Sequence, residues 1–172
     1  MNASKWDEAV VIALGSNLKG PFASTRELLE AALARFEGEA MMIAHRSSWW
    51  RSDAWPDPSA PPFLNGVVIV ETEMGPRQTL AALHRIEAAF GRDRHVPNAP
   101  RTLDLDLIAY GRKVGDFDSL MLPHPRAAER RFVMGPLAEI APAWRHPVTG
   151  EEAGVLVENC EVGLDATASA RA

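Results

Sequence analysis

Apolar residues fall into four short runs, separated by two longer segments in which they recur at helical spacing. The runs are bounded by glycine, proline or polar residues, as buried strands are, and they cover residues 9–14, 41–50, 63–72 and 103–110. The first helical segment opens at Ser24, whose spacing to Glu27 fits a capping box, and closes at Gly38. The second opens at Pro76 and closes at Gly91.

The order of these elements, β-α-β-β-α-β, is that of ferredoxin-like folds. It predicts an α+β protein whose antiparallel sheet carries both helices on one face. Residues 52–62 contain four prolines without periodicity and are expected to form a loop. The residues after 110 must cover the second face or extend an edge, with short helices at 125–131 and 137–140. We expect one domain over residues 1–172, ending in a frayed tail at 166–172.

Composition limits the classes of protein to which this chain can belong. Its 172 residues, 47% apolar and 24% charged, are enough for one globular core. Cys160 is the only cysteine, so no internal disulfide can form. No charged leader precedes an apolar core at the N-terminus, and the run 9–14 is too short to cross a bilayer. With a net charge of −5, nucleic acid is not the expected partner. We expect a cytoplasmic monomer without membrane contact.

The most informative local feature is the pair Asp104 and Asp106 in the fourth strand. Residues two apart on a strand point to the same side, so both carboxylates share one face while the intervening leucines enter the core. Such a pair on its own is also compatible with a solvated strand face. Here it follows Arg92, Arg94 and Arg101, and guanidinium groups bind phosphate oxygens bidentately. Mg²⁺ held by carboxylates beside arginines is the arrangement that phosphoryl-type transfer requires.

Three further polar residues are candidates for a binding site. His124 lies between two prolines, and either a hydrogen-bonded turn or a ligand contact would explain it. Glu87 lies on the second helix just before the arginines, where it could pair with one of them or contact a nucleotide. Asn65 lies beside Phe63 at the start of the third strand, a combination that suits a flat heterocycle, although a strand-end asparagine needs no ligand. The tryptophans are interpreted as anchors of core and loop.

Taken together, these segments resemble one family, the 6-hydroxymethyl-7,8-dihydropterin pyrophosphokinases. The most specific match is Pro-Arg-Thr-Leu-Asp-Leu-Asp at residues 100–106. The other matching segments follow in the family's order between about residues 10 and 142, namely 13–18, 63–65, 85–87, 91–94, 122–125, 130–132 and 136–142. The resemblance implies a three-layer αβα fold. It also implies transfer of pyrophosphate from MgATP to the pterin hydroxymethyl group, with release of AMP, in folate biosynthesis.

The resemblance implies a role for each matched position. Asp104 and Asp106 would hold two Mg²⁺ ions, and Arg92 and Arg101 would be catalytic, stabilising the transferred group. The ATP site would be lined by His84, Glu87, Arg94, Leu107, His124 and Arg130. The pterin pocket would be formed by Ser52, Ala54, Trp55, Phe63, Asn65 and Phe132, with the ring between the two phenylalanines.

The sequence departs from the family after Arg94, where residues 95–99 lack the usual arginine and tryptophan. An inactive relative that still binds ATP would share this change. Two further classes are compatible with the fold. RNA-binding modules have the same element order but place aromatic residues on the central strands, where this chain has aspartates. Nucleotidyl transferases with an Asp-x-Asp pair would release inorganic pyrophosphate in place of AMP.

Overall fold

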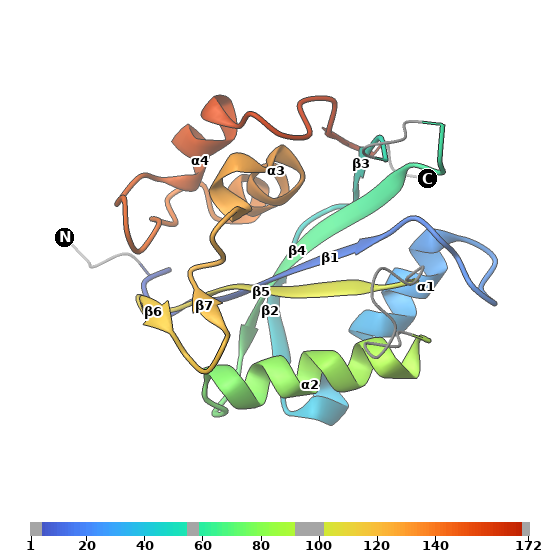
Figure 1. The fold of residues 1–172 in the computed structure, drawn as a ribbon, viewed down its shortest axis with the longest axis horizontal. Helices are drawn as coiled ribbons and strands as arrows, with labels where there is room; N and C mark the ends of the chain where they lie inside the picture. Colours follow the sequence, from blue (N-terminus) through green and yellow to red (C-terminus); the bar gives the residue numbers. More distant parts are fainter. Residues whose placement is uncertain (1–4, 55–58, 92–101, 170–172) are drawn as a thin grey trace.

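The computed structural model describes residues 5–54, 59–91 and 102–169, and its centre is an antiparallel sheet (Figure 1). The strand order is β5-β1-β4-β3-β8. Strand β2 pairs with residues 68–71 of β4, on the same side of β4 as β3, which pairs with residues 63–65. The strands of this sheet are β1 Val10–Ser16, β2 Met42–Arg46, β3 Trp50–Ser52, β4 Phe63–Glu71, β5 Asp104–Tyr110 and β8 Thr167–Ala168. A separate hairpin pairs β6 Gly115–Asp116 with β7 Met121–Leu122.

Helices cover both faces of this sheet, which makes three layers (Figure 1). One face carries α1 Thr25–Leu33 and α2 Pro76–Ala89, and the other carries α3 Arg131–Ile140 and α4 Ala153–Leu156. Two separate apolar clusters, one on each side of the sheet, form the core. In the described part of the chain, three 3-10 turns complete the elements: η1 Glu37–Glu39, η2 Ala127–Glu129 and η3 Val157–Asn159. The predicted α+β, ferredoxin-like, three-layer fold is therefore confirmed.

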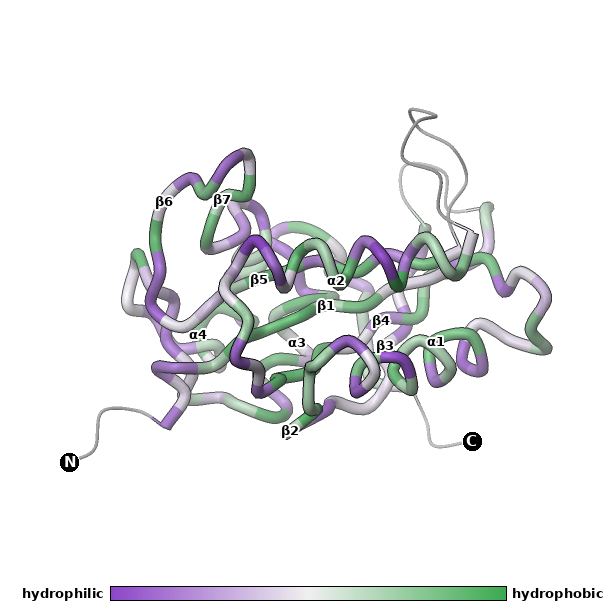
Figure 2. The backbone as a smooth tube through the Cα atoms, turned by 90° about the horizontal axis from the view of Figure 1, so that it is seen from below, coloured by the Kyte–Doolittle hydropathy of each residue, from purple (hydrophilic) through white to green (hydrophobic). Residues whose placement is uncertain are grey.

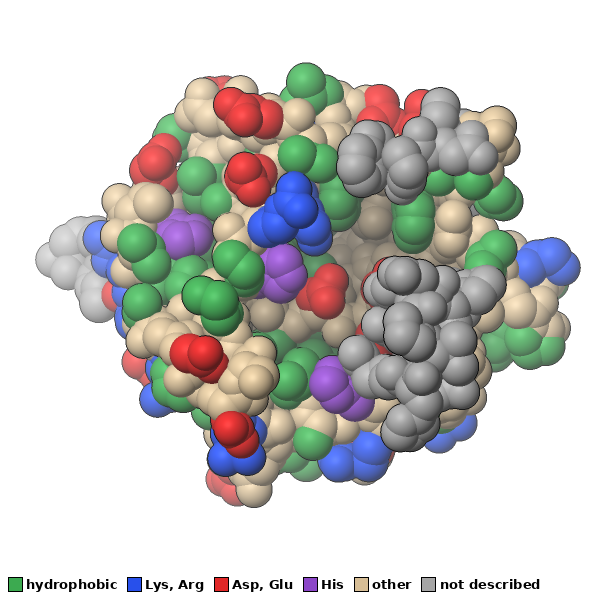
Figure 3. All heavy atoms as spheres, in the orientation of Figure 1, with side chains coloured by type: hydrophobic (Ala, Val, Ile, Leu, Met, Phe, Trp, Pro, Cys, Tyr) green, Lys and Arg blue, Asp and Glu red, His purple; other side chains and the backbone are tan. Residues whose placement is uncertain are grey.

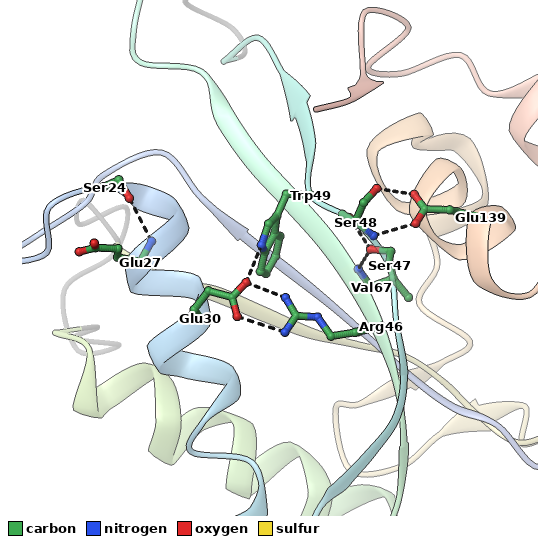
Figure 4. Close-up of polar contacts among 9 residues, drawn as sticks. All are labelled: Ser24, Glu27, Glu30, Arg46, Ser47, Ser48, Trp49, Val67 and Glu139. Carbon is green, nitrogen blue, oxygen red and sulfur yellow. Dashed lines mark hydrogen bonds and ion pairs between the residues drawn. The ribbon is translucent and has the colours of Figure 1, made fainter. Parts of the chain in front are cut away.

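Local sequence explains where the two long helices start. The Ser24 hydroxyl accepts a hydrogen bond from the Glu27 amide at 3.1 Å, as the capping-box spacing predicts (Figure 4). The Gly75 amide donates to the Gln78 side chain at 3.0 Å, directly before Pro76. Hydrophilic and hydrophobic residues alternate around α1 and α2, so each helix buries one side against the sheet (Figure 2).

The end of the second helix was predicted correctly and that of the first was not. Gly91 has φ +94 and follows the last turn of α2, a conformation that glycine adopts without a steric penalty. The first helix ends at Leu33, before Gly38, and a turn at residues 34–36 separates it from the 3-10 turn η1. Its left-handed residue is Ala40, at φ +63, because the Met41 amide donates back to the carbonyl of buried Phe36.

The strand predicted at residues 41–50 is two strands, β2 and β3, and the chain that joins them has one residue more than the stretch of β4 opposite it. Arg46 is opposite Val68 and Trp50 is opposite Asn65, so four steps on one strand match three on β4. Ser47 bridges the interruption: its amide donates to the Val67 carbonyl at 2.9 Å, and its hydroxyl accepts from the Val67 amide at 3.0 Å (Figure 4). Single extra residues of this kind bend a strand and redirect its side chains.

Trp49 and Trp50, which follow this interruption, anchor the chain to opposite faces of the sheet. The Trp49 indole N–H donates to Glu30 on α1 at 2.9 Å, and the Trp50 indole N–H donates to Glu139 on α3 at 2.8 Å. Glu30 also holds Arg46 through two hydrogen bonds of 2.7 and 3.1 Å (Figure 4). The expectation that these tryptophans act as anchors is confirmed.

A glycine faces each of these two indole rings. A Cβ atom on Gly66 would lie 2.6 Å from the Trp49 ring, and one on Gly135 would lie 2.5 Å from the Trp50 ring. The short helix predicted at 137–140 is the end of a longer one, because α3 begins at Arg131 and runs through Gly135 and Pro136 to Ile140. The glycine at 135 makes room for a tryptophan and does not end the helix. The other predicted short helix, at 125–131, is the 3-10 turn η2.

The C-terminal residues are part of the sheet, so the frayed tail expected from Ala166 is wrong for residues 166–169. Ala166 is fully buried, and its carbonyl accepts from the Arg131 side chain at 3.0 Å. Strand β8 then pairs with β3. Residues 170–172 lie outside the described part of the chain. Within the described ranges, no helix has the length and apolar character needed to cross a membrane.

Candidate active site

A cavity of about 520 Å³ lies between the sheet and the helical layer formed by η2 and α3. Figure 3 shows this side of the molecule, which is hollowed and has basic, acidic and histidine side chains around the hollow. The volume is in the range of small-molecule sites. Eight of the residues predicted from the sequence line it: Ser52, Phe63, Asn65, Asp104, Asp106, His124, Arg130 and Phe132.

Three residues on adjacent strands form a row across the floor of the cavity. Asp104 of β5 is opposite Gly15 of β1, and Gly15 is opposite Asn65 of β4. Residues paired in this way project from the same face of an antiparallel sheet. A Cβ atom on Gly15 would lie 3.1 Å from the Asn65 side-chain oxygen. The glycine therefore leaves open the space between the carboxylate and the amide.

The two aspartates project into this cavity as the strand pattern predicts. Leu103, Leu105 and Leu107 are at most 2% exposed and pack in the core on the α1–α2 side. Asp104 and Asp106 line the cavity on the opposite side. Asp106 is opposite Ala13 of β1, whose small side chain adds to the free space.

The other end of the cavity combines an amide with two aromatic rings. Asn65 is 5% exposed, and its side-chain amide donates to the Ser52 hydroxyl at 2.9 Å. Phe63 comes from the start of β4 and Phe132 from the first turn of α3, so the two rings belong to different layers. A flat heterocycle with polar edges is the kind of ligand that such a slot binds.

His124 is held by the main chain at the acidic end of the cavity. Its amide donates to the Ile108 carbonyl at 2.8 Å, and its Nδ1 accepts from the Arg126 amide at 3.2 Å. Burial lowers the pKa of His124, and the charges of Arg130 and Arg126 lower it further, while Asp106 acts in the opposite direction. The ring is therefore neutral at pH 7 with its proton on Nε2, and it can donate a hydrogen bond there.

Basic side chains border the same end. Arg130 precedes α3 and lies between the two ends, because its charge acts on His124 while its guanidinium carbon lies 5.8 Å from the centre of the Phe132 ring. Arg126 also lines the cavity, 3.8 Å from Glu129, although the sequence reasoning assigned it no role. The concentration of arginines between residues 126 and 131 was the signal that could have identified it.

The structure does not bring four of the predicted residues into this cavity. Glu87 is 1% exposed on α2, behind β5, and its carboxylate accepts from the Leu105 amide at 2.8 Å. It thus holds the main chain between the two aspartates from the side opposite the cavity. His84 lies on the same helix, Leu107 points into the core, and Ala54 is buried beside the lining residues. Trp55, Arg92, Arg94, Arg101 and the altered loop 95–99 lie outside the described residues.

The paired aspartates fit one kind of metal ion. Among the described residues, no cluster of three or more histidine, cysteine, aspartate or glutamate side chains could enclose a metal. Mg²⁺ does not require such a cluster, because one or two carboxylates, phosphate oxygens and waters complete its coordination. Asp104 and Asp106, at one end of a cavity bordered by arginines, fit a magnesium ion that arrives with a phosphorylated ligand.

The ferredoxin-like fold and the composition of the cavity suit an enzyme that acts on a phosphorylated small molecule. One family model, described as 7,8-dihydro-6-hydroxymethylpterin-pyrophosphokinase (HPPK), matches residues 11–142. The chain belongs to this HPPK family.

Similar proteins agree with this assignment. The 2-amino-4-hydroxy-6-hydroxymethyldihydropteridine pyrophosphokinase of Synechocystis sp. is 40% identical over 151 residues, which is 88% of this chain and 75% of that protein. The protein of the same name from Pseudomonas aeruginosa is 40% identical over 142 residues, covering 81% and 85%. The crystal structure of wild-type HPPK-DHPS from Plasmodium falciparum matches with a TM-score of 0.66 at 12% identity. That match covers 87% of this chain and 44% of that chain, and it supports the fold alone.

Proposed function

We propose that this protein transfers the pyrophosphoryl group of ATP to the hydroxymethyl group of 6-hydroxymethyl-7,8-dihydropterin in folate synthesis. The observation that carries the proposal is the row Asp104, Gly15 and Asn65, which connects an acidic end and an amide-lined end within one cavity. The acidic end suits the phosphates with their metal, and the end with Phe63 and Phe132 suits the pterin.

The reaction joins the two ends of the cavity. The pterin hydroxyl oxygen attacks the β-phosphorus of ATP, and the bond between that phosphorus and the oxygen bridging to the α-phosphate breaks. AMP leaves with this oxygen, and the hydroxyl proton passes to solvent. Because the transition state is mainly negative charge on phosphoryl oxygens, the residues that hold and neutralise this charge supply most of the catalysis.

We assign the charge-holding roles to residues of the acidic end. Asp104 and Asp106 would hold two Mg²⁺ ions, which neutralise and orient the phosphate oxygens when bound. Arg130 and Arg126 would bind those oxygens with their guanidinium groups, and neutral His124 would donate from Nε2. Arg92 and Arg101 stay proposed catalytic residues, and Arg94 a proposed ATP contact, on the strength of the sequence resemblance.

We assign pterin recognition to the amide-lined end. Asn65 is nearly buried and fixed by Ser52, so its remaining polar atoms are pre-oriented for the edge of a heterocycle. Phe63 and Phe132 would stack on the two faces of the ring. The monomeric state expected from the sequence stays a prediction, which light scattering of the purified protein would test.

The assay is nucleotide product analysis with MgATP, with and without the pterin. AMP formed only in the presence of the pterin, in step with a pyrophosphorylated pterin, is the expected result. Inorganic pyrophosphate as the product would indicate a nucleotidyl transferase, and bound ATP without turnover would indicate an inactive relative.

The aspartates provide the sharper test of the site. Asp106→Ala should abolish turnover, because loss of a charge-holding group costs several kcal/mol, on the order of a hundredfold or more in rate. Asp116→Asn is the matched control, since Asp116 lies in the β6 strand and is not a lining residue of the cavity. Retention of more than about a tenth of the activity by Asp106→Ala would exclude the proposed metal site.

A further inference from the structure

The C-terminal segment lies outside the residues matched to the family model, yet it forms part of the cavity wall. The match ends at residue 142, whereas Glu161, Val162 and Gly163 line the same cavity as the aspartates and Asn65. No role in binding has been assigned to this segment so far, and the sequence alone gave no signal for one.

Main-chain hydrogen bonds fix the segment against the start of α3. The Val162 amide donates to the Glu129 carbonyl at 3.0 Å, and the Arg131 amide donates to the Val162 carbonyl at 2.9 Å. A hydrogen bond of 2.9 Å from the Ala166 amide to the Gly163 carbonyl then closes a tight turn. Residues 163–166, which we term the C-terminal turn, are therefore held in place from both ends.

One end of the C-terminal turn supports the aromatic wall of the cavity. Gly163 has φ +72, in the left-handed region, and a Cβ atom there would lie 2.6 Å from Cδ1 of the Phe132 ring. Real Cβ atoms do not approach a ring carbon so closely. The ring of Phe132 therefore occupies a position that only a glycine at residue 163 permits.

The other end of the C-terminal turn supports the opposite wall. The Asp165 carboxylate accepts a hydrogen bond from the Asp53 amide at 2.6 Å, next to Ser52. Immediately afterwards, β8 pairs with β3, with Thr167 opposite Arg51. The turn thus contacts the chain that carries Ser52 and Asp53 as well as the ring of Phe132.

We infer that the C-terminal turn is a positioning element for the pterin end of the site, setting the separation between Phe132 and the segment that carries Ser52. This inference rests on the proposed function, which supplies the pterin as the ligand between these walls. Gly163 and Asp165 act through their neighbours and not through contact with the reacting atoms. Substitutions in the turn should therefore affect pterin binding far more than ATP binding.

Two glycines provide a matched pair of variants for the test. Gly163→Ala adds a methyl group against Phe132, whereas Gly150→Ala adds one at a similar φ of +75 with no atom within 4 Å. Both variants place an alanine at a similar left-handed φ, and only the first meets the Phe132 ring. In the AMP assay, Gly163→Ala should raise KM for the pterin about tenfold, the scale of one lost aromatic contact, and change KM for ATP less than twofold. Gly150→Ala should leave both constants unchanged.

A second pair of variants tests the other wall independently. Asp165→Ala removes the acceptor for the Asp53 amide and should raise KM for the pterin severalfold, on the scale of one hydrogen bond. Asp165→Asn keeps an acceptor oxygen and should restore the wild-type value.

The outcomes separate the inference from the proposed function. An active wild-type enzyme in which Gly163→Ala behaves like Gly150→Ala would overturn the inference alone. Equal increases of KM for both substrates would do the same, because they would indicate a general structural defect. A wild-type protein that forms no AMP with the pterin would overturn the proposed function and the inference with it.

Discussion

Glu139 on α3 receives three hydrogen bonds from the link between β2 and β3. Its carboxylate accepts from the Ser48 amide at 2.7 Å, the Ser48 hydroxyl at 2.6 Å and the Trp50 indole at 2.8 Å. This one side chain therefore attaches the α3 layer to the chain that leads into the cavity. Glu139→Ala would remove all three bonds while leaving the helix backbone intact.

The stability cost of this change can be worked from those contacts. Hydrogen bonds to a charged group contribute about 1.5–3 kcal/mol when buried, but Glu139 is exposed, so water replaces part of each lost bond. At roughly 0.7 kcal/mol for each of the three bonds, the free energy of unfolding should fall by about 2 kcal/mol. For a domain of this length, that corresponds to a decrease in Tm of about 4–8 °C.

Urea denaturation and thermal melting followed by circular dichroism measure the change. Glu139→Gln should give an intermediate loss of about 1 kcal/mol, because an amide oxygen accepts while its NH₂ group cannot. Glu158→Ala, at an exposed position in η3, is the control and should stay within about 0.5 kcal/mol of wild type. If Glu139→Ala matched Glu158→Ala, the three bonds would contribute nothing net and the reasoning would be refuted.

Three further predictions concern pH and packing. Burial alone would raise the pKa of Glu139, but the hydrogen bonds from Ser48 and Trp50 outweigh it and lower the pKa. The wild-type protein should therefore be more stable than Glu139→Gln above pH 4.5, and this difference should disappear as the pH falls through the lowered pKa. If this is wrong, the unfolding free energies of the two proteins will not converge on acid titration. Gly66→Ala should cost about 1–3 kcal/mol and change the near-ultraviolet dichroism of Trp49, whereas Gly38→Ala, with nothing within 4 Å, should not. Glu87→Ala should cost about 2 kcal/mol, because it leaves the buried Leu105 amide without its acceptor, and unchanged stability would contradict this role.

The elements with strong local patterns were predictable from the sequence. Strand β5 alternates leucine and aspartate, so its two faces could be assigned without coordinates. The capping box at Ser24 and the glycine at 91 fixed helix ends for the same reason, because their chemistry is local. The role of a residue could not be predicted where its neighbours come from distant parts of the chain. Gly135 makes room for the ring of Trp50, which lies far away in the sequence, so local spacing could not explain this glycine.

The same distinction applies to the site. The paired aspartates and Asn65 come from strands whose order follows from β-α-β-β-α-β, so their meeting in one cavity was predictable. Glu87 comes from α2 on the other side of the sheet, and its carboxylate accepts from a main-chain amide of the edge strand β5, which spacing alone cannot reveal. The C-terminal turn was missed because its four residues form no recognisable motif, and its place depends on the hydrogen bonds that the preceding Val162 makes with Glu129 and Arg131.

The row of Asp104, Gly15 and Asn65 fixes the distance between the acidic end and the amide-lined end of the cavity. The two outer residues are separated by two strand spacings, or about 10 Å of main chain. This length is set by backbone hydrogen bonds and does not adjust when a side chain rotates. If the pterin and the phosphates bind at the two ends as proposed, a pterin with a longer arm than hydroxymethyl would place its oxygen past the phosphorus. Point substitutions in the cavity would alter affinity, but selectivity for the length of the arm would persist as long as β1 stays between β4 and β5.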